Sequence, residues 1–454
     1  MNDSLIEKYN TPAPRYTSYP TVPFWDTDQF SVKFWKMSTV RAFEESNSQE
    51  GISLYIHLPF CEQLCTFCGC NKRITKNHQV EQPYIHALLK EWQIYRSLFT
   101  HPPKIKELHL GGGSPTFFQA QNLAYLIEGI LKDTYPAHQP LFSFEGNPNN
   151  TTKTHLQVLF DLGFRRVSYG IQDYHPAVQK AIHRVQPFEQ VQKVHELSQK
   201  VGYTSINHDL IYGLPLQTLD SILDTIHKTH QLRPDRIAFY SYAHVPWIKG
   251  NGQRGFSEKD LPQATQKRTL YEEGRKLLEA NGYREVGLDH FSLPKDDLYQ
   301  AFQQGHLHRN FMGYTSSKTQ LMIGLGTSSI SDSWYGFAQN VKKVETYLEL
   351  IGKGELPVFR GHHLTQEDLA IRQHILNLMC QLQTNWETST AFFAGLPQTY
   401  ERLRVFEADQ LILMNDQGLQ ITPAGQPFLR NICLAFDTRF WQQQPTTQTF
   451  SMAI

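Results

Sequence analysis

Short apolar runs alternate with segments of helical periodicity between residues 53 and 280. The runs are rich in Val, Ile, Leu and Phe, and polar residues, Gly or Pro mostly follow them, which is typical of buried strands. We predict strands over Ser53–Leu58, Ile105–Leu110, Leu141–Phe144, Arg166–Gly170, Ser205–Ile211 and Arg236–Ser241. Apolar spacings of three and four predict helices over Tyr84–Leu98, Gln119–Leu131, Lys153–Leu162, Glu189–Val201, Thr218–Leu232 and Gln263–Ala280.

Strand and helix alternate six times in this region, which indicates parallel strands joined by crossover helices. Six units are two short of a closed eight-stranded barrel. The predicted fold class is therefore α/β, an open three-quarter (β/α)6 TIM-like barrel, with a doubly wound sheet as the alternative. Residues 1–35 lack a clear period and predict an irregular N-terminal arm. Residues 36–360 predict the barrel with appended strands, and residues 361–454 a small, mainly helical C-terminal domain.

Polar residues and glycines gather just past the predicted strands. The segments are Pro59-Phe60-Cys61, Gly111-Gly112-Gly113-Ser114, Glu145-Gly146-Asn147-Pro148, Gln172-Asp173, Tyr212-Gly213-Leu214-Pro215 and Ala243-His244. Parallel barrels place their active sites at the carboxyl ends of the strands. We therefore expect these loops to converge on one mouth.

Charge and hydropathy narrow the class of protein. The 454-residue chain has 43 basic and 43 acidic residues, so no net field favours nucleic acid or an anionic membrane. No apolar run approaches the roughly 20 residues of a membrane helix. Residues Met1–Tyr9 have no apolar signal core. We therefore expect a cytoplasmic protein that binds neither nucleic acid nor membrane, with a balanced charge compatible with a monomer.

Four of the six cysteines lie within ten residues, at Cys61, Cys65, Cys68 and Cys70. Cysteines crowded in a cytosolic chain usually bind metal or carry out redox chemistry. A C-x3-C-x2-C loop supplies three thiolates to a [4Fe–4S] cluster. The fourth iron is then open to S-adenosylmethionine (SAM), through its amino and carboxylate groups. Cys70 lies so close to Cys68 that joint ligation of one cube is awkward, and we predict that Cys70 is not a ligand.

Two other interpretations of the cysteines remain open. One is a structural zinc knuckle, although zinc sites typically use two cysteine pairs separated by a dozen or more residues. The other is an electron-transfer cluster held by all four thiolates. Cys380 and Cys433 stand apart from the group, and we expect both to be small buried hydrophobic residues.

Several short runs occur in a characteristic order along the chain. They are Pro14-Arg15-Tyr16-Thr17-Ser18-Tyr19-Pro20, the cysteine loop from Tyr55 to Asn71, Gly111-Gly112-Gly113-Ser114-Pro115-Thr116, Asn207-His208-Asp209-Leu210-Ile211-Tyr212-Gly213-Leu214-Pro215, His308-Arg309-Asn310-Phe311 and Arg430-Asn431-Ile432-Cys433. Together they resemble the oxygen-independent coproporphyrinogen III oxidase family, also called coproporphyrinogen dehydrogenases, in the radical SAM superfamily. The resemblance extends over nearly the whole chain.

The resemblance implies a fold and a cofactor set. The fold is an open barrel with an N-terminal arm near the site and a C-terminal domain over it. The cofactors are one [4Fe–4S] cluster, on Cys61, Cys65 and Cys68, and two SAM molecules. The resemblance places the first SAM against Tyr55, Gly112, Glu145 and Ile330. It places the second SAM against Phe67, Gly113, Ser114, Gln172, Arg184, Asp209 and Ala243. Tyr55 and Cys70 are also counted among the catalytic residues.

The activity implied is the oxidative decarboxylation of two propionates of coproporphyrinogen III to vinyl groups. The product is protoporphyrinogen IX, in heme biosynthesis, and the sequence identifies neither the electron donor nor the acceptor. A tetra-anionic substrate attracts basic side chains. We take Arg15, His290, His308 and Arg309 as candidates, with ordinary surface or capping roles as the alternative for each.

Each of these side chains also has a simpler role available. Glu145 could cap a loop, and the glycine run alone indicates a tight turn or a close backbone approach. Asp209 interrupts an apolar strand and needs a partner, either ribose hydroxyls or Arg184. Two positions depart from the family pattern, because Ser114 replaces a threonine and Asn147 replaces an aspartate.

Two other functions in the same superfamily compete with the decarboxylase. A heme chaperone would share the barrel and the three-cysteine loop, and would bind heme without transforming a porphyrinogen. Such chaperones typically lack Cys70 and the Arg15–Pro20 part of the arm, and both are present here. A heme-degrading radical methyltransferase is the third possibility.

Overall fold

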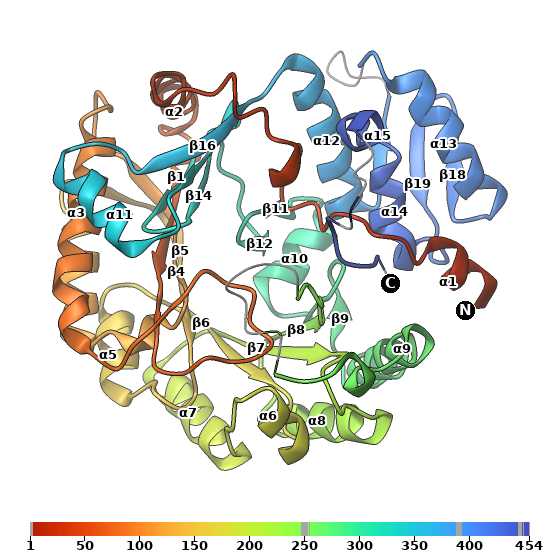
Figure 1. Cartoon of the computed structure of the whole chain (residues 1–454), viewed down its shortest axis with the longest axis horizontal. Coiled ribbons are helices and arrows are strands. Elements are labelled where there is room, and N and C mark those ends of the chain that lie inside the picture. The colour runs from red at the N-terminus through yellow and green to blue at the C-terminus, as the bar shows by residue number, and fades with distance from the viewer. Residues whose placement is uncertain are drawn as a thin grey trace.

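The computed structural model describes residues 3–246, 253, 255–386, 393–443, 447 and 449–453. The barrel occupies the lower left of Figure 1, with the C-terminal domain at its upper right. Six strands at the predicted places pair in parallel. They are β1 (Ile52–Leu58), β4 (Lys104–Gly112), β5 (Tyr135–Gly146), β6 (Arg166–Gln172), β7 (Ser205–Tyr212) and β8 (Arg236–Ser241).

Helices follow the strands and cover the outside of the sheet (Figure 1). The six predicted helices are present, with a further short helix, α6, between β6 and α7. Their bounds are α3 (Glu81–Arg96), α4 (Ala120–Leu131), α5 (Lys153–Asp161), α6 (Pro176–Ala181), α7 (Phe188–Val201), α8 (Leu219–Leu232) and α9 (Ala264–Ala280).

The sheet is an open one. Its twelve strands run in the order β16-β15-β14-β13-β1-β4-β5-β6-β7-β8-β10-β9, so β16 and β9 form its two edges. Strand β13 adds to β1 in parallel, and the other outer strands pair antiparallel. The outer strands are β9 (Arg284–Glu285), β10 (His290–Ser292), β13 (Met322–Leu325), β14 (Ile330–Asp332), β15 (Gly336–Asn340) and β16 (Val358–His363). This arrangement confirms the predicted open barrel with appended strands.

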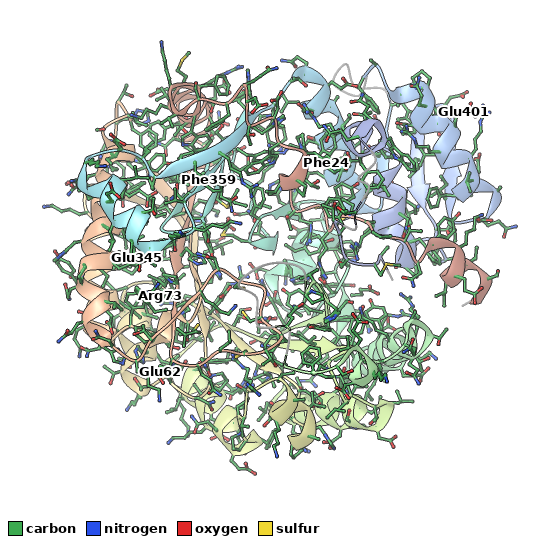
Figure 2. All side chains as sticks on the ribbon, in the orientation of Figure 1. Phe24, Glu62, Arg73, Glu345, Phe359 and Glu401 are labelled. Atoms are coloured by element: carbon green, nitrogen blue, oxygen red, sulfur yellow. The ribbon has the colours of Figure 1, made fainter. Side chains whose placement is uncertain are left out.

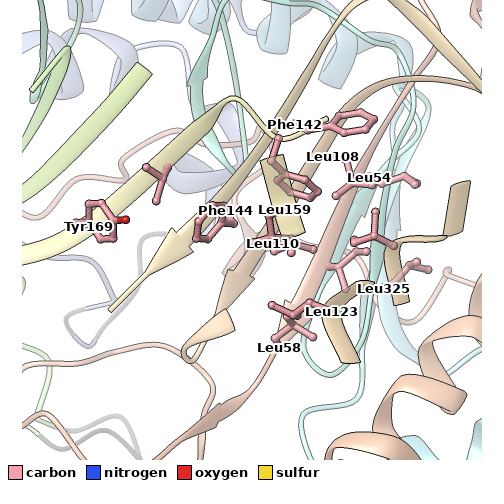
Figure 3. Packing of buried hydrophobic residues seen from close by; sticks show 14 of the residues in the cluster. Leu54, Leu58, Leu108, Leu110, Leu123, Phe142, Phe144, Leu159, Tyr169 and Leu325 are labelled. Carbon is pink, nitrogen blue, oxygen red and sulfur yellow. The ribbon is translucent and has the colours of Figure 1, made fainter. Parts of the chain in front are cut away.

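Side chains alternate between the two faces of each barrel strand. On β4, Leu108 and Leu110 are fully buried, and they pack with Leu123 of α4 in the core cluster that Figure 3 shows. His109 lies between those two leucines and faces the barrel interior, where it lines a cavity. The same alternation puts Ser143 and Glu145 of β5 inside. The apolar face therefore binds the helices, and the polar face is left for chemistry.

The N-terminal arm differs from the prediction, because it is not irregular throughout. Residues Asp3–Tyr9 form a helix, α1, and the arm ends where α2 (Val32–Ser46) begins. The segment between them is held by the C-terminal part of the chain, and Tyr16 Oη donates to Asp437 at 3.0 Å. Pro12 also forms a β-bridge with Met452. These partners are far away in sequence, so the hydrophobic pattern of the arm alone did not predict α1.

The C-terminal segment contains the predicted helices and a small sheet. The helices are α12 (Gln366–Gln381), α13 (Leu396–Ala408), α14 (Leu429–Leu434) and α15 (Thr438–Gln443), and the strands β17 (Gln383–Asn385), β18 (Ile412–Met414) and β19 (Gly418–Ile421). Its apolar core includes three tyrosines of the arm, Tyr9, Tyr16 and Tyr19. Cys380 and Cys433 are buried in that core, as predicted. The domain boundaries at residues 35 and 360 stay a prediction.

One short helix and two short strands lie between the barrel and the C-terminal segment. They are α10 (Asp297–Gln303), β11 (His308–Asn310) and β12 (Gly313–Thr315), and α11 (Val344–Gly352) joins β15 to β16. Leu298 of α10 and Tyr314 of β12 belong to the same core as the C-terminal helices. Among the described residues, no helix has the length and apolar character needed to cross a bilayer.

Candidate active site

A cavity of about 550 Å³ opens at the carboxyl ends of the barrel strands. Segments that are far apart in sequence line it, from the cysteine loop near residue 61 to Tyr240 at the end of β8. Twelve of the predicted site residues line this cavity. They are Cys61, Cys65, Phe67, Cys68, Cys70, Gly112, Gly113, Ser114, Glu145, Gln172, Arg184 and Asp209. The predicted convergence is therefore confirmed for the loops after β1, β4, β5 and β6, whereas Tyr212–Pro215 and Ala243–His244 do not line this cavity.

The cysteine loop is anchored at both ends. Its first strand, β2 (Phe60–Cys61), pairs in parallel with β3 (Arg73–Ile74). Arg73 also forms an ion pair of 3.1 Å with Glu345 of α11, and both labels lie close together in Figure 2. In the middle, the Thr66 amide donates to the Ile182 carbonyl at 3.0 Å. These contacts hold the loop across the barrel mouth.

The pKa values of three of these thiols are shifted in different directions. A hydrogen bond from the Cys70 thiol lowers the pKa of Cys68 to about 6, and Lys72 contributes to this shift. The same hydrogen bond raises the pKa of Cys70 well above its ordinary value. Burial and the neighbouring thiols raise the pKa of Cys61 to about 12. Cys68 therefore ionises more readily than Cys61 or Cys70, which favours metal binding.

The three proposed ligands have the chemistry and the placement that a cluster needs. All three proposed ligands are free cysteines that line the cavity. A cube binds each thiolate to a different iron, so its ligands surround a volume and do not converge on one point. Among the residues that the structure describes, no three His, Cys, Asp or Glu side chains are grouped as ligands of one metal ion. Arg184 lies beside the loop, with Nη1 3.7 Å from the Cys65 sulfur.

The glycine run after β4 makes room for the chain itself. A Cβ at Gly112 would lie 2.7 Å from the His57 ring, and Gly112 has a φ of +117°. A Cβ at Gly113 would lie 2.6 Å from the Pro59 carbonyl oxygen. The amides of Gly113 and Ser114 donate to the Leu58 and Phe60 carbonyls at 2.9 and 3.0 Å. The glycines therefore bring this loop against the cysteine loop, which a side chain would prevent.

Glu145 is an ionised carboxylate facing the cavity. Its side chain is 45% exposed there, and Oε2 accepts from the Gly112 amide at 3.2 Å. His109 Nε2 lies 3.5 Å from Oε1. Burial alone would raise the pKa of Glu145, but His109 and the amide outweigh it, so the pKa is lowered. Glu145 is thus prepared to receive a cationic group.

The pKa of Asp209 is shifted in the opposite direction from that of Glu145. It accepts from Ser168 Oγ at 2.9 Å and from Asn207 Nδ2 at 2.7 Å. Burial raises its pKa to about 6, and the negative charge of Glu145 adds to the shift. Arg184, which the sequence allowed as the alternative partner of Asp209, donates instead to the Gly170 carbonyl at 2.8 Å. Asp209 therefore retains acceptor capacity toward the cavity.

Three predicted cofactor residues lie beside the cavity and not in its lining. Tyr55 points into the barrel, with Oη 3.0 Å from His57 Nδ1. The Ala243 carbonyl accepts from Gln253, whose amide also donates to the Phe67 carbonyl at 2.9 Å. Ile330 is the first residue of β14, and β13 lies between β14 and β1 in the sheet.

The structure brings together three of the four substrate candidates. Arg15 and Arg309 both act electrostatically on His290 and lower its pKa, after burial. His308 is separate and lines a different cavity, of about 780 Å³, between the opposite end of the barrel and the C-terminal segment. Adjacent residues of a strand face opposite sides, which is why Arg309 and His308 of β11 diverge.

Sequence reasoning missed several polar residues of the interior. His57, His109, Ser168 and Tyr240 were not singled out, although each occupies an inward position of a predicted strand. Alternation with buried leucines was the available signal for His57 and His109. That signal gives the face of the strand but not the partner across the barrel.

Comparison with known proteins agrees with the fold and the cavity. Residues 55–229 match the Radical SAM superfamily. A coproporphyrinogen III oxidase from Escherichia coli, described as a radical SAM enzyme, has a solved structure with a TM-score of 0.89 and 32% identity, covering 96% of this chain and 98% of that one. The barrel with its three-cysteine loop therefore defines a radical SAM enzyme, which uses a [4Fe–4S] cluster and SAM.

Curated sequences narrow the family further. The oxygen-independent coproporphyrinogen III oxidase of Helicobacter pylori is 37% identical over 95% of each chain. The Synechocystis enzyme of the same name is 36% identical, over 99% of this chain and 97% of its own. The chain belongs to the oxygen-independent coproporphyrinogen III oxidase family.

Proposed function

We propose that the protein decarboxylates two propionate side chains of coproporphyrinogen III oxidatively, giving protoporphyrinogen IX in heme biosynthesis. The observation that carries the proposal is the cavity in which the three-cysteine loop faces Glu145 and Asp209. Each propionate loses carbon dioxide, one hydrogen atom and one electron, and becomes a vinyl group. No oxygen is consumed, so an electron acceptor is required.

The chain would hold the reagents through its own side chains. We assign Cys61, Cys65 and Cys68 to the cluster, which together with SAM supplies a carbon radical that takes a hydrogen atom from the substrate. Glu145 would accept a charge-assisted hydrogen bond from the amino group of that SAM. Cys70 would stay outside the cluster and keep its proton, since its pKa is raised well above the ordinary value.

We further propose a second SAM molecule in the same cavity. The residues that the family resemblance assigns to it include Ser114, Gln172 and Asp209, and all three line the cavity. Ser114 Oγ supports this proposal, because it is buried and has no hydrogen-bond partner among the described residues. Ribose hydroxyls would donate to the carboxyl oxygens of Asp209.

The cellular setting follows from the same proposal. We propose a cytoplasmic monomer that works without nucleic acid or membrane and exchanges electrons with a separate donor and acceptor. The equal numbers of acidic and basic residues support the first part. The barrel mouth is where electrons would enter, because the cysteine loop lies there.

Anaerobic turnover tests the proposed function. The reconstituted protein is incubated with coproporphyrinogen III, SAM and a reductant, and the products are separated by chromatography. We expect protoporphyrinogen IX and about two carbon dioxide molecules per substrate. Tight heme binding without product would favour the chaperone, and methyl transfer to heme would favour the methyltransferase.

A matched set of variants tests the cluster assignment. Serine at any of the three proposed ligands is expected to abolish iron binding, whereas Cys70→Ser should leave the iron content intact. Iron and labile sulfide are measured together with the electron paramagnetic resonance signal, with and without SAM. Zinc in oxygen-free preparations, or a signal that ignores SAM, would contradict the assignment.

A further inference from the structure

Four cationic side chains meet beneath the N-terminal arm, beside the barrel mouth. Arg15 comes from the arm, Lys267 from α9, Arg309 from β11 and Arg430 from α14. We call these four residues the cation cluster. Their charges act on one another. Burial, followed by Arg430 and Arg15, lowers the pKa of Lys267 to about 8. Burial and then Arg15 lower the pKa of Arg430 to about 9.

The cation cluster has one ion-pair partner among the described residues, Asp289, while Glu272 and Glu285 line the cavity that Arg15 and Arg430 share. Arg15 forms an ion pair with Asp289, and that carboxylate is shared with His290 at 2.8 Å. Lys267 Nζ donates to a neutral acceptor, the Tyr242 carbonyl, at 2.9 Å. The guanidinium of Arg430 likewise donates to backbone carbonyls of the arm and of the C-terminal end of the chain. Cations held away from water destabilise the fold unless an anion compensates them.

Within the part of the chain that the structure describes, Arg15 is the one member of the cation cluster that forms an ion pair. The other three members, Lys267, Arg309 and Arg430, form none there. Arg309 Nε and Nη2 donate to the carbonyls of Tyr16 and Arg15, each at 3.3 Å. Its Nη1 is buried and has no acceptor within the described residues. Arg309 is only 4% exposed, so solvent does not supply that acceptor freely. This buried N–H is therefore an unused donor, which a carboxylate could accept from.

Arg15 and Arg430 of the cation cluster line a cavity of about 280 Å³, and Arg15 and Arg309 contact aromatic side chains that line the neighbouring cavities. The guanidinium of Arg309 stacks on Tyr314, 4.4 Å from the ring centroid. Tyr314 lines an inner cavity of about 150 Å³ together with Glu145 and Asp209. Tyr240 lines both this inner cavity and the larger one, and Arg15 lies 5.7 Å from its ring centroid. An anion on the cluster would therefore lie next to the reacting part of a large substrate.

We propose that the cation cluster binds carboxylates of the tetrapyrrole that do not react, and so presents a reacting propionate to the cofactor. This inference rests on the proposed function and adds the subsite that fixes the orientation of the substrate. The substrate carries four carboxylates, of which two remain in the product. Lys267 and Arg430 belong to this subsite, although neither was among the substrate candidates chosen from the sequence. The arm supplies Arg15 and two of the carbonyls that orient Arg309.

Porphyrin binding by the reconstituted full-length protein tests the cation cluster. The probes are coproporphyrin III, a stable tetracarboxylate, and its uncharged tetramethyl ester, with affinity measured from porphyrin fluorescence. We expect Arg309→Gln to weaken binding of the tetracarboxylate about 10- to 100-fold and to leave binding of the ester unchanged, since a hydrogen bond between charged groups is lost. Arg309→Lys should recover part of the loss. During turnover, KM should rise more than kcat falls.

Two further variants separate substrate binding from folding. Arg165→Gln is the matched control, because Arg165 also donates to carbonyls only, at Phe160 and Phe164, and lies at the opposite end of β6. It should not change either affinity. Lys267→Met removes a repelled charge, so it should raise or maintain the melting temperature of the ligand-free protein while weakening tetracarboxylate binding.

The outcomes distinguish this inference from the proposed function. Tetracarboxylate affinity that survives in both Arg309→Gln and Lys267→Met overturns the inference, and so does an equal loss of tetracarboxylate and ester binding. A wild-type protein that binds the tetracarboxylate through these residues but forms no protoporphyrinogen overturns the proposed function alone. Iron content and the SAM-induced spectral change should be the same in all variants, which shows that the cofactor site is intact.

Discussion

Glu145→Gln removes one negative charge from the cavity and almost no volume. The carboxylate is held by the Gly112 amide at 3.2 Å and by His109 at 3.5 Å, so it is oriented before any ligand arrives. A hydrogen bond to a charged group contributes about 1.5–3 kcal/mol. We therefore expect the affinity for SAM to fall about 10- to 150-fold. The amide of glutamine still accepts from Gly112, so the fold should be unchanged.

Equilibrium dialysis or calorimetry on the anaerobically reconstituted protein measures this affinity. Glu128→Gln is the control, because Glu128 is an exposed carboxylate of α4 that does not line the cavity and should have no effect. The melting temperature and iron content of Glu145→Gln should match those of the wild type. Glu145→Asp keeps the charge but shortens the side chain, and an intermediate affinity is expected.

The dependence on pH has a definite sign. The pKa of Glu145 is lowered below its ordinary value, so the carboxylate is ionised throughout the neutral range. Its contribution to SAM binding should stay constant above about pH 6 and disappear only as the pH falls through the lowered pKa. Unchanged SAM affinity in Glu145→Gln, or a contribution that changes between pH 7 and 8, would refute the reasoning.

Three further predictions concern other parts of the site. Gly112→Ala should lower the free energy of unfolding by about 2–5 kcal/mol, because Gly112 has a positive φ and a Cβ there would overlap the His57 ring. Gly69→Ala should leave the free energy of unfolding unchanged, because the space around Gly69 is open. Chemical denaturation measures the free energy of unfolding of the two variants. Asp209→Asn should stabilise the ligand-free protein above pH 6 by at most about 3 kcal/mol, because the folded-state pKa is raised to about 6. This gain should fade towards pH 4 in thermal scans, and a gain independent of pH would contradict it. Cys70→Ala should raise the pKa of Cys68 by removing a thiol hydrogen bond, and alkylation rates of the iron-free protein at several pH values would reveal an unchanged Cys68.

Local sequence patterns were sufficient to predict the strands and helices of the barrel. On β7, Ile206, His208 and Leu210 are buried towards the helices, and Asn207 and Asp209 face inwards. A period of two in a short apolar run, followed by a helical period, is a local signal that each unit carries alone. The helix α1 was missed because its stability depends on distant partners. Tyr9 of that helix stacks on Phe406 of α13, at a centroid separation of 4.9 Å.

The candidate site was predictable to the extent that residues lie on consecutive strand ends. Cysteine spacing and position after β1 were enough to place the loop at the mouth, and Glu145 and Asp209 followed from the same rule. The reason for the glycine run was not predictable. Gly112 has to avoid the ring of His57, which belongs to a different strand.

The sequence alone determined the open barrel, the three-cysteine loop and the end of the barrel that carries the chemistry, because each depends on spacing along the chain. Tertiary structure alone decided the electrostatics. Burial and the charge of Glu145 set the pKa of Asp209, and hydrogen bonding to Cys70 sets that of Cys68. It also decided that Lys267 of a helix and Arg430 near the C-terminus lie beside Arg15 of the arm. Interactions of this kind depend on distance in space, which residue order does not record.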